Sequence, residues 1–200
     1  ILNDAQITPE TLRAMEPRIA AATDVILPGN PLDVVAYGCT SASMAIGEEK
    51  VFDRIRSVRP DAKCTTPITA AFAAFRALKA KRIGVLTPYR ADVNRIVADY
   101  IRARGFEVPV FGSFNEQDDG RVSRITPASV KRGVDTILSK AKVDAVFVSC
   151  TSVRLAESAR TIEAETGVPV TSSNHAMAWH ALRLAGVKDA IPGWGRLFRV

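Results

Sequence analysis

Two cysteines stand in the same short context at distant points of the chain. The segment DVVAYGCTS at residues 33–41 returns as DAVFVSCTS at residues 144–152, which places Cys39 and Cys150 111 residues apart (150 − 39). In each copy an apolar run precedes the cysteine, and Thr and Ser follow it. The repeat predicts two similar lobes, with the two cysteines facing each other across one cleft at the carboxyl ends of their strands.

A cysteine between the end of a strand and the start of a helix lies at the positive end of the helix dipole, near free backbone N–H groups. We therefore expect Cys39 and Cys150 to favour the thiolate form. With one thiol on each face of a planar carbon, one thiol attacks or removes a proton while the other delivers a proton. This chemistry needs no cofactor. We expect the neighbouring hydroxyl and N–H groups to hold a carboxylate, namely those of Thr40, Ser41, Thr151 and Ser152.

The remaining cysteine and the histidines suggest no metal site or disulfide framework. Cys64 lies inside a predicted strand without the Thr-Ser context, so we expect it to be structural. Three widely spaced cysteines without a CxxC pattern argue against a disulfide scaffold. His175 and His180 are five residues apart, which does not place them on one helix face as a pair of metal ligands.

Short β-branched runs alternate with helical patterns along most of the chain, an order typical of α/β proteins with mostly parallel sheets. The predicted strands lie near residues 33–38, 62–65, 82–87, 107–112, 144–149 and 168–171. The predicted helices lie near residues 8–22, 42–58, 68–80, 91–104, 127–141, 152–166 and 174–185. The polar stretch 113–121 is expected to be a loop. These elements predict two pseudo-symmetric α/β lobes, each a mostly parallel sheet flanked by helices.

Composition narrows the class of protein further. The 200 residues are 47% hydrophobic and 24% charged, which is typical of a globular protein. Lys and Arg (27) exceed Asp and Glu (21), giving a net charge of +6 that suits anionic partners. No nucleic-acid-binding signature accompanies this charge, and no apolar run approaches the ~20 residues that span a bilayer. We expect a cytoplasmic protein with no nucleic-acid or membrane partner.

Five motifs occur in a fixed order: GCTS (38–41), LTPY (86–89), SCTS (149–152), VTSSNHAMAWHALRLAG (170–186) and PGWGRLF (192–198). Together they resemble the Asp/Glu racemase superfamily and, within it, the branch of maleate cis-trans isomerases and arylmalonate decarboxylases. The resemblance runs from about residue 7 to the end. It implies two α/β lobes with the active site between them, no cofactor, a small carboxylate substrate and a homo-oligomer. We expect residues 1–80 and 175–200 to form one lobe and residues 81–174 the other.

The resemblance also implies roles for single residues. Cys39 matches the nucleophile or base, Cys150 the acid on the opposite face, and Tyr89 a tyrosine whose hydroxyl donates to a substrate carboxylate. The positions that line the carboxylate pockets match Thr40, Ser41, Thr151 and Ser152. Decarboxylases of this branch have glycine in place of the first cysteine, so the presence of both cysteines favours an isomerase or a racemase.

One departure from the family pattern concerns the substrate. Maleate isomerases have a substrate-contacting asparagine in the loop after the fourth strand, and by spacing its position falls on Asp119. A shift of one residue would place Asp118 or Gly120 there instead. A carboxylate at this position repels a second substrate carboxylate and favours an ammonium or amide group. Amino acids and N-acyl diaminobutyrate, the latter because proteins encoded with ectoine breakdown look similar, therefore compete with maleate.

A second departure lies at the start of the chain. The family has a further strand and loop that close one wall of the substrate pocket, and we expect this segment to be missing here. Either it belongs to a longer protein or the site is incomplete. Three functions follow: a two-cysteine isomerase of a small carboxylate, a racemase or related enzyme acting on an amino acid or N-acyl diaminobutyrate, and a non-catalytic small-molecule binder.

Overall fold

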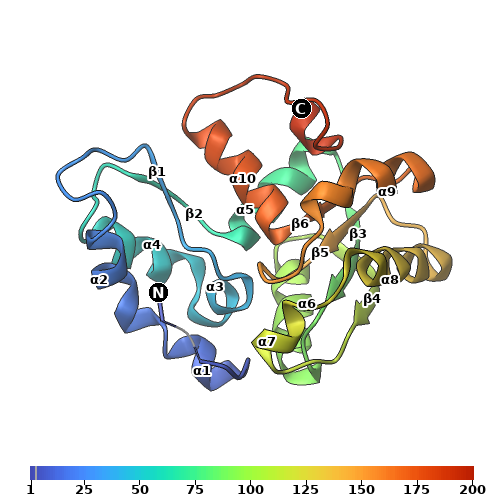
Figure 1. Ribbon diagram of the computed structural model, residues 1–200, viewed down its shortest axis with the longest axis horizontal. Coiled ribbons are helices and arrows are strands. Elements are labelled where there is room, and N and C mark those ends of the chain that lie inside the picture. Colours follow the sequence, from blue (N-terminus) through green and yellow to red (C-terminus); the bar gives the residue numbers. More distant parts are fainter. Residues whose placement is uncertain (3) are drawn as a thin grey trace.

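Two parallel sheets form the two lobes of the protein in a computed structural model, which describes residues 1–2 and 4–200. The smaller sheet pairs β1 (Val34–Ala36) with β2 (Lys63–Thr65). The larger sheet has the strand order β4-β3-β5-β6, and all its pairs are parallel (Figure 1). Its strands are β3 (Arg82–Thr87), β4 (Glu107–Ser113), β5 (Ala145–Val148) and β6 (Val170–Ser172).

Helices flank both sheets. The first lobe carries α1 (Pro9–Arg13), η1 (Glu16–Arg18), α2 (Ile19–Asp24), α3 (Thr40–Ile46), α4 (Glu48–Arg56) and α5 (Pro67–Ala77). The chain continues with α6 (Ala91–Ala103), α7 (Asp119–Val122), α8 (Pro127–Lys140), η2 (Ala156–Ser158), α9 (Ala159–Thr166), α10 (Ser173–Leu184) and η3 (Leu197–Arg199). No helix in the described part of the chain has the length and apolar character needed to cross a membrane.

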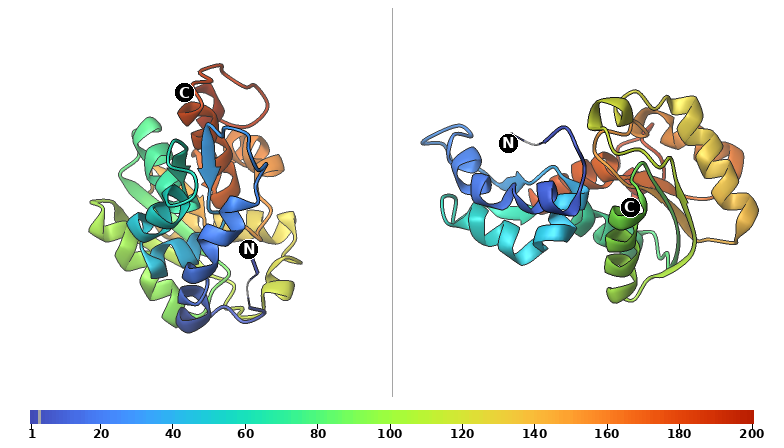
Figure 2. Two further views of the ribbon diagram at one scale, coloured as in Figure 1. Left: turned by 90° about the vertical axis from the view of Figure 1, so that its left-hand side faces the viewer. Right: turned by 90° about the horizontal axis from the view of Figure 1, so that it is seen from below.

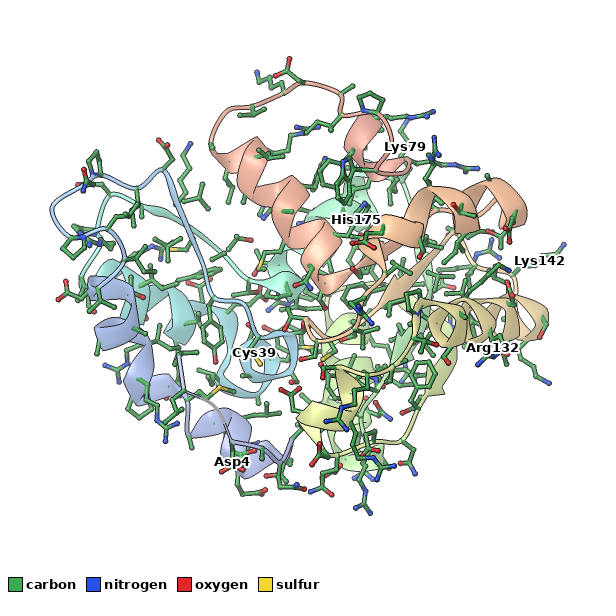
Figure 3. All side chains as sticks on the ribbon, in the orientation of Figure 1. Asp4, Cys39, Lys79, Arg132, Lys142 and His175 are labelled. Carbon is green, nitrogen blue, oxygen red and sulfur yellow. The ribbon has the colours of Figure 1, made fainter. Side chains whose placement is uncertain are left out.

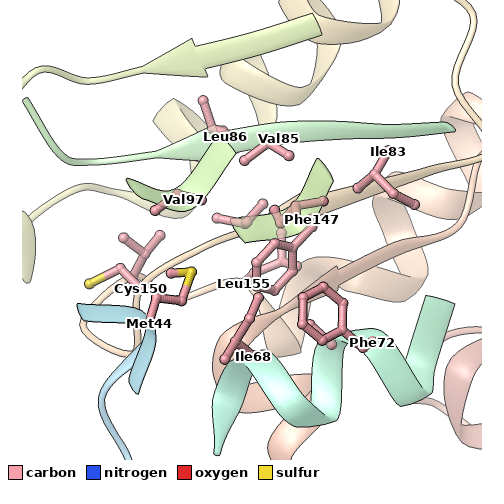
Figure 4. Packing of buried hydrophobic residues seen from close by; sticks show 14 of the residues in the cluster. Met44, Ile68, Phe72, Ile83, Val85, Leu86, Val97, Phe147, Cys150 and Leu155 are labelled. Atoms are coloured by element: carbon pink, nitrogen blue, oxygen red, sulfur yellow. The ribbon is translucent and has the colours of Figure 1, made fainter. Parts of the chain in front are cut away.

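The core of the larger lobe explains why β3 and β5 occupy the centre of the sheet. All four residues of β5 are buried, as are five of the six in β3, which gives the continuous apolar runs typical of strands covered on both faces. Figure 4 shows Ile83 and Val85 of β3 packed near Phe147 of β5 and near Ile68 and Phe72 of α5. Helix α5 therefore packs against the larger sheet as well as against its own lobe.

Helices α5 and α10 pack against each other in the middle of the molecule, and α10 also contacts β1, β2 and β6 (Figures 1 and 2). Each of these helices follows the second strand of one copy of the repeat. The expected fold class, two α/β lobes with parallel sheets, is confirmed. The exact lobe boundaries, residues 1–80 with 175–200 and residues 81–174, stay a prediction.

All six predicted strands are present, but three helical predictions and one loop prediction need correction. The helix expected over 8–22 is divided into α1, η1 and α2. The helix expected over 42–58 breaks at Gly47, whose φ of 98° lies in the region that glycine tolerates best. The helix expected from residue 152 begins only with η2 and α9. The expected loop 113–121 contains the start of α7, which Asp118 caps by accepting a hydrogen bond from the Arg121 N–H.

Candidate active site

A pocket of about 320 Å³ lies between the lobes and contains both cysteines of the repeat. Its walls come from the turns after β1, β3 and β5, from the start of α7 and from the amino-terminal segment. In Figure 3 Cys39 lies on the side of the smaller lobe that faces the larger lobe. All eight residues that the sequence predicts for the site line this pocket: Cys39, Thr40, Ser41, Tyr89, Asp119, Cys150, Thr151 and Ser152.

Cys39 occupies the N-cap position of α3, as the sequence predicts, yet its thiol does not favour the thiolate form. Burial raises the pKa of Cys39 to about 11, and the nearby Cys150 and Asp119 also raise it. Hydrogen bonding from the Ala42 N–H and the Ser41 hydroxyl lowers this pKa, but by less than burial raises it. The expectation of a depressed pKa is therefore wrong for the unliganded protein.

Cys150 is not at a helix N-terminus, so no helix dipole stabilises its thiolate. The chain turns after β5, and its next helical residues are those of η2. Cys150 has a φ of 110°, which non-glycine residues rarely adopt. Burial raises the pKa of its thiol, while hydrogen bonds from Tyr89 and from the Ser152 N–H, 3.4 Å from Sγ, lower it. Both thiols are thus protonated near neutral pH.

Tyr89 lies at the end of β3 and its side chain reaches both cysteines. The residue is only 1% exposed. Burial raises the pKa of its phenol well above the usual value, and the charges of Cys150 and Cys39 in their thiolate forms raise it further. The hydroxyl therefore stays protonated near neutral pH and is available as a hydrogen-bond donor. It can donate to a thiolate or to a substrate carboxylate.

Each of the four predicted carboxylate-binding hydroxyls already has a hydrogen-bond partner within the protein, and that of Ser41 is the Cys39 thiol, 3.9 Å away. Thr40 donates to Ser173 Oγ at 2.7 Å, Thr151 to the Gly38 carbonyl at 3.0 Å, and Ser152 to Asp119 Oδ1 at 3.0 Å. The groups that could donate to a carboxylate in this pocket are the Tyr89 hydroxyl, backbone N–H groups at the start of α3, and these four hydroxyls after they rotate.

Asp119 lies inside the pocket, whereas the two neighbours that a shifted alignment would select do not line it. Asp118 caps α7, and its carboxylate accepts a hydrogen bond from the Arg121 N–H. The Asp119 backbone N–H donates to the Ala5 carbonyl at 3.2 Å, which fixes α7 against the amino-terminal segment. The carboxylate remains an acceptor that faces the cavity.

The sequence reasoning missed the amino-terminal wall of the pocket. Asp4, Gln6, Ile7, Thr11, Leu12 and Met15 line it. Gln6 and Asp118 form an antiparallel bridge, and the Ile7 N–H donates to the Gln117 carbonyl at 3.0 Å. The sequence offers one signal for this segment, the pair Thr8-Pro9, which marks the start of α1 because Thr8 caps the helix and Pro9 is its first residue. Residues 4–15 thus form one wall of the pocket in this chain.

The other singled-out residues lie outside the pocket. His175 Nδ1 is 3.0 Å from the Thr171 hydroxyl and its Nε2 is 2.6 Å from the Trp194 carbonyl, so this histidine connects α10 to the carboxy-terminal loop. His180 bonds to Thr65, and Cys64 is half-buried on β2. Within residues 1–2 and 4–200, no group of three or more His, Cys, Asp or Glu side chains could hold a metal ion.

A two-lobed α/β fold with two thiols and a protonated tyrosine converging on one small pocket defines a class of cysteine-dependent enzymes. A family model described as arylmalonate decarboxylase matches residues 3–198, and the chain belongs to this family. The maleate isomerase of Pseudomonas putida is 31% identical over 200 residues, covering 96% of this chain and 79% of that protein.

Two solved structures show the same architecture. One is a cysteine-to-alanine variant of the maleate isomerase Iso from Pseudomonas putida S16 with maleate; it has a TM-score of 0.86 and 27% identity, covering 98% of this chain and 81% of that one. The other is a cysteine-to-serine variant of the Nocardia farcinica maleate cis-trans isomerase with a covalently bound succinylcysteine intermediate. Its TM-score is 0.88 at 28% identity, covering 98% of this chain and 82% of that one. The family therefore contains isomerases and decarboxylases.

Proposed function

We propose that this chain is a cofactor-independent isomerase that converts the cis double bond of a small unsaturated dicarboxylate, such as maleate, to trans. The observation that carries the proposal is the convergence of Cys39, Cys150 and Tyr89 on one pocket of about 320 Å³. This volume is at the lower end of small-molecule sites, which suits a four-carbon substrate. The relatives named above support the same reaction class.

The first step requires a thiolate at Cys39. Because burial raises the pKa of this thiol, its proton must leave to solvent before or during substrate binding. The sulfur then adds to one alkene carbon, and the electron pair of the double bond moves to the neighbouring carbon. Cys150 gives that carbon its thiol proton. The product of this step is a saturated succinyl thioether on Cys39, with Cys150 as the thiolate.

The second step returns Cys39 to the thiolate and Cys150 to the thiol. Rotation about the new carbon–carbon single bond turns one carboxylate to the other side. Cys150 removes a proton from the carbon it had protonated, the double bond re-forms, and the bond to the Cys39 sulfur breaks. Tyr89 donates to the thiolate of Cys150 or to the carboxylate on which charge develops. No electrons are gained or lost overall, so the reaction needs no redox cofactor.

Proton NMR tests this function directly. We expect the parent protein to convert the maleate signal to the fumarate signal. Cys39→Ser and Cys150→Ser should each lower the rate by at least about 10³-fold while circular dichroism shows an unchanged fold. Cys64→Ser is the matched control, because Cys64 lies outside the pocket, and it should keep the parent rate. An undiminished rate in Cys39→Ser contradicts the mechanism.

A second candidate function is favoured by Asp119. Its carboxylate lines the pocket and is an acceptor, which suits an ammonium or amide group on the substrate. In this version the substrate is an amino acid or an N-acyl diaminobutyrate. The two cysteines exchange a proton on opposite faces of its α-carbon, which racemises the substrate.

A substrate panel in D₂O separates the two functions. The panel contains maleate, aspartate, glutamate and N-acetyl-diaminobutyrate. Loss of an α-proton signal with maleate untouched supports the racemase. Asp119→Asn should then raise KM for the nitrogen-bearing substrate, whereas under the isomerase hypothesis it should lower KM for maleate. Asp118→Asn is the control, because Asn also caps helices and residue 118 does not line the pocket. No change in any signal contradicts both and favours a binding protein.

A further inference from the structure

Ser173, the first residue of α10, joins the two halves of the repeat through one oxygen atom. Its hydroxyl oxygen accepts a hydrogen bond from the Cys150 N–H at 3.0 Å and another from the Thr40 hydroxyl at 2.7 Å. Ser173 is fully buried. Thr40 follows the first cysteine and Cys150 is the second, so this oxygen links the Cys150 backbone to the side chain of the residue next to Cys39.

The Cys150 backbone needs such a link. Its φ of 110° is unfavourable for a residue with a side chain, and such conformations persist only when neighbouring groups hold them. No helix follows Cys150 directly, and the bond from the Val153 N–H to its carbonyl is long, at 3.4 Å. The bond from the Cys150 N–H to Ser173 is shorter and wholly buried. It therefore holds the peptide group that directly precedes the Cys150 side chain.

Ser173 does not contact the substrate space itself. The residue is absent from the pocket lining, and a serine hydroxyl has two acceptor sites, both of which are occupied by Cys150 and Thr40. Any effect of Ser173 on the reaction must therefore act through those two residues.

We propose that Ser173 is a positioning residue that holds the strained Cys150 backbone so that the thiol faces Cys39 across the pocket. The kinetic part of this inference rests on the proposed function, whereas its consequences for thiol reactivity and for the Cys150 amide do not. The chain offers a matched control in Ser149, the residue before Cys150. Ser149 is also fully buried, but its hydroxyl has no hydrogen-bond partner among the described residues.

The kinetic experiment compares Ser173→Ala with Ser149→Ala. We expect Ser173→Ala to lower kcat by about 10- to 100-fold, because a small displacement of a reacting group is enough for such a loss. KM should change much less. Ser149→Ala should keep the parent kcat and KM, and Ser173→Thr, which retains the hydroxyl, should recover part of the lost kcat. Equal kcat values in Ser173→Ala and Ser149→Ala overturn the proposal.

Two measurements decide the inference even if no panel substrate is converted. Iodoacetamide labelling read by peptide mass spectrometry should show faster alkylation of Cys150 in Ser173→Ala, relative to Cys39 in the same sample, because the released backbone exposes the thiol. An unchanged ratio overturns the proposal. If Ser173→Ala does not fold, hydrogen exchange on the parent protein replaces it. The Cys150 amide should be protected as strongly as those of β5, and exchange at the rate of an open loop contradicts the proposal.

Discussion

The two thiols are protonated near neutral pH, because burial raises the pKa of each by more than the neighbouring hydrogen bonds lower it. A helix dipole contributes typically 0.3–1 kcal/mol, whereas one pKa unit corresponds to about 1.36 kcal/mol. The pKa of Cys39 rises from 9.0 to about 11, a change opposite in direction to the effect of the dipole. Desolvation therefore dominates, and the N-cap position of Cys39 reduces that effect without reversing it.

The raised pKa of Cys39 makes its reactivity in the free protein depend on pH. Because the pKa of Cys39 is raised, its thiolate fraction should increase roughly tenfold per pH unit from pH 7 and level off near pH 11. Iodoacetamide alkylation of Cys39 without substrate should follow that curve, with Cys39→Ser identifying the peptide. A reaction rate that already levels off near pH 7 would show that the thiolate is stabilised instead.

The Tyr89 hydroxyl is expected to contribute both to turnover and to the reactivity of the Cys150 thiol. Tyr89→Phe removes one hydroxyl donor from a buried site, and loss of one such donor typically costs about 10²-fold in kcat. We expect that loss together with slower alkylation of Cys150, because the tyrosine hydrogen bond lowers the pKa of this thiol. Steady-state kinetics and labelling of the same preparation check both. A normal kcat with slowed labelling would leave the tyrosine a role only at the thiol.

Among the helices, a single buried carboxylate lies at the break between α3 and α4 and connects α4 to two other helices. Glu48, the first residue of α4, is buried at this break. Its carboxylate accepts hydrogen bonds from Tyr100 at 2.8 Å and Arg104 at 2.6 Å, both at the C-terminal end of α6, and from Thr69. One carboxylate thus connects α4, α5 and α6.

Glu48→Gln should therefore destabilise the protein. A neutral amide weakens three hydrogen bonds to a charged acceptor, each worth about 1.5–3 kcal/mol, and keeps part of each, so we expect a loss of about 1–3 kcal/mol in unfolding free energy. Urea denaturation measures this as a lower midpoint. Glu49→Gln is the control, since Glu49 is the exposed neighbour in the same helical turn. Equal midpoints for both variants would refute a stabilising role for this cluster.

The elements also show what the sequence alone could predict. The strands and the repeat follow from local pattern, because an apolar run before Cys-Thr-Ser is typical of a strand end, and this pattern also predicts the two cysteines and their Thr and Ser neighbours in the pocket. Tyr89 and Asp119 were predicted from the family resemblance. The buried state of Glu48 and the bond from Cys150 to Ser173 depend on partners 52 to 56 and 23 residues away. Contacts between residues so far apart in the sequence cannot be predicted from a local pattern. The late start of α9 was missed for a related reason, since a tertiary turn overrides helical periodicity after Cys150.

At the scale of the whole molecule, the pocket exists only where the lobes meet. Residues from the smaller lobe, the larger lobe and the amino-terminal segment all line it. A ligand that bridges these parts must stabilise their arrangement, because it binds the folded state and not the unfolded one.

Succinate tests this consequence, since it has the length of maleate but no double bond to attack. At a concentration 100 times its Kd, a ligand adds about 2.7 kcal/mol, which for a chain of this size raises Tm by about 5–10 °C. Differential scanning fluorimetry measures the shift, with sulfate at equal ionic strength as the control. Hydrogen exchange should slow both at α3 and at residues 150–153. Equal shifts with succinate and sulfate would mean that only general anion effects are present.

The unusual backbone angle of Cys150 implies a conflict between durability and use. A residue with a φ of 110° costs folding free energy that glycine would largely avoid, of the order of 1–3 kcal/mol. We expect Cys150→Gly to melt at a higher temperature than Cys150→Ala, although both lose the same thiol. Selection for stability alone would favour glycine at this position. The presence of a thiol at this position therefore means that function, and not folding stability, has determined which residue adopts this backbone angle.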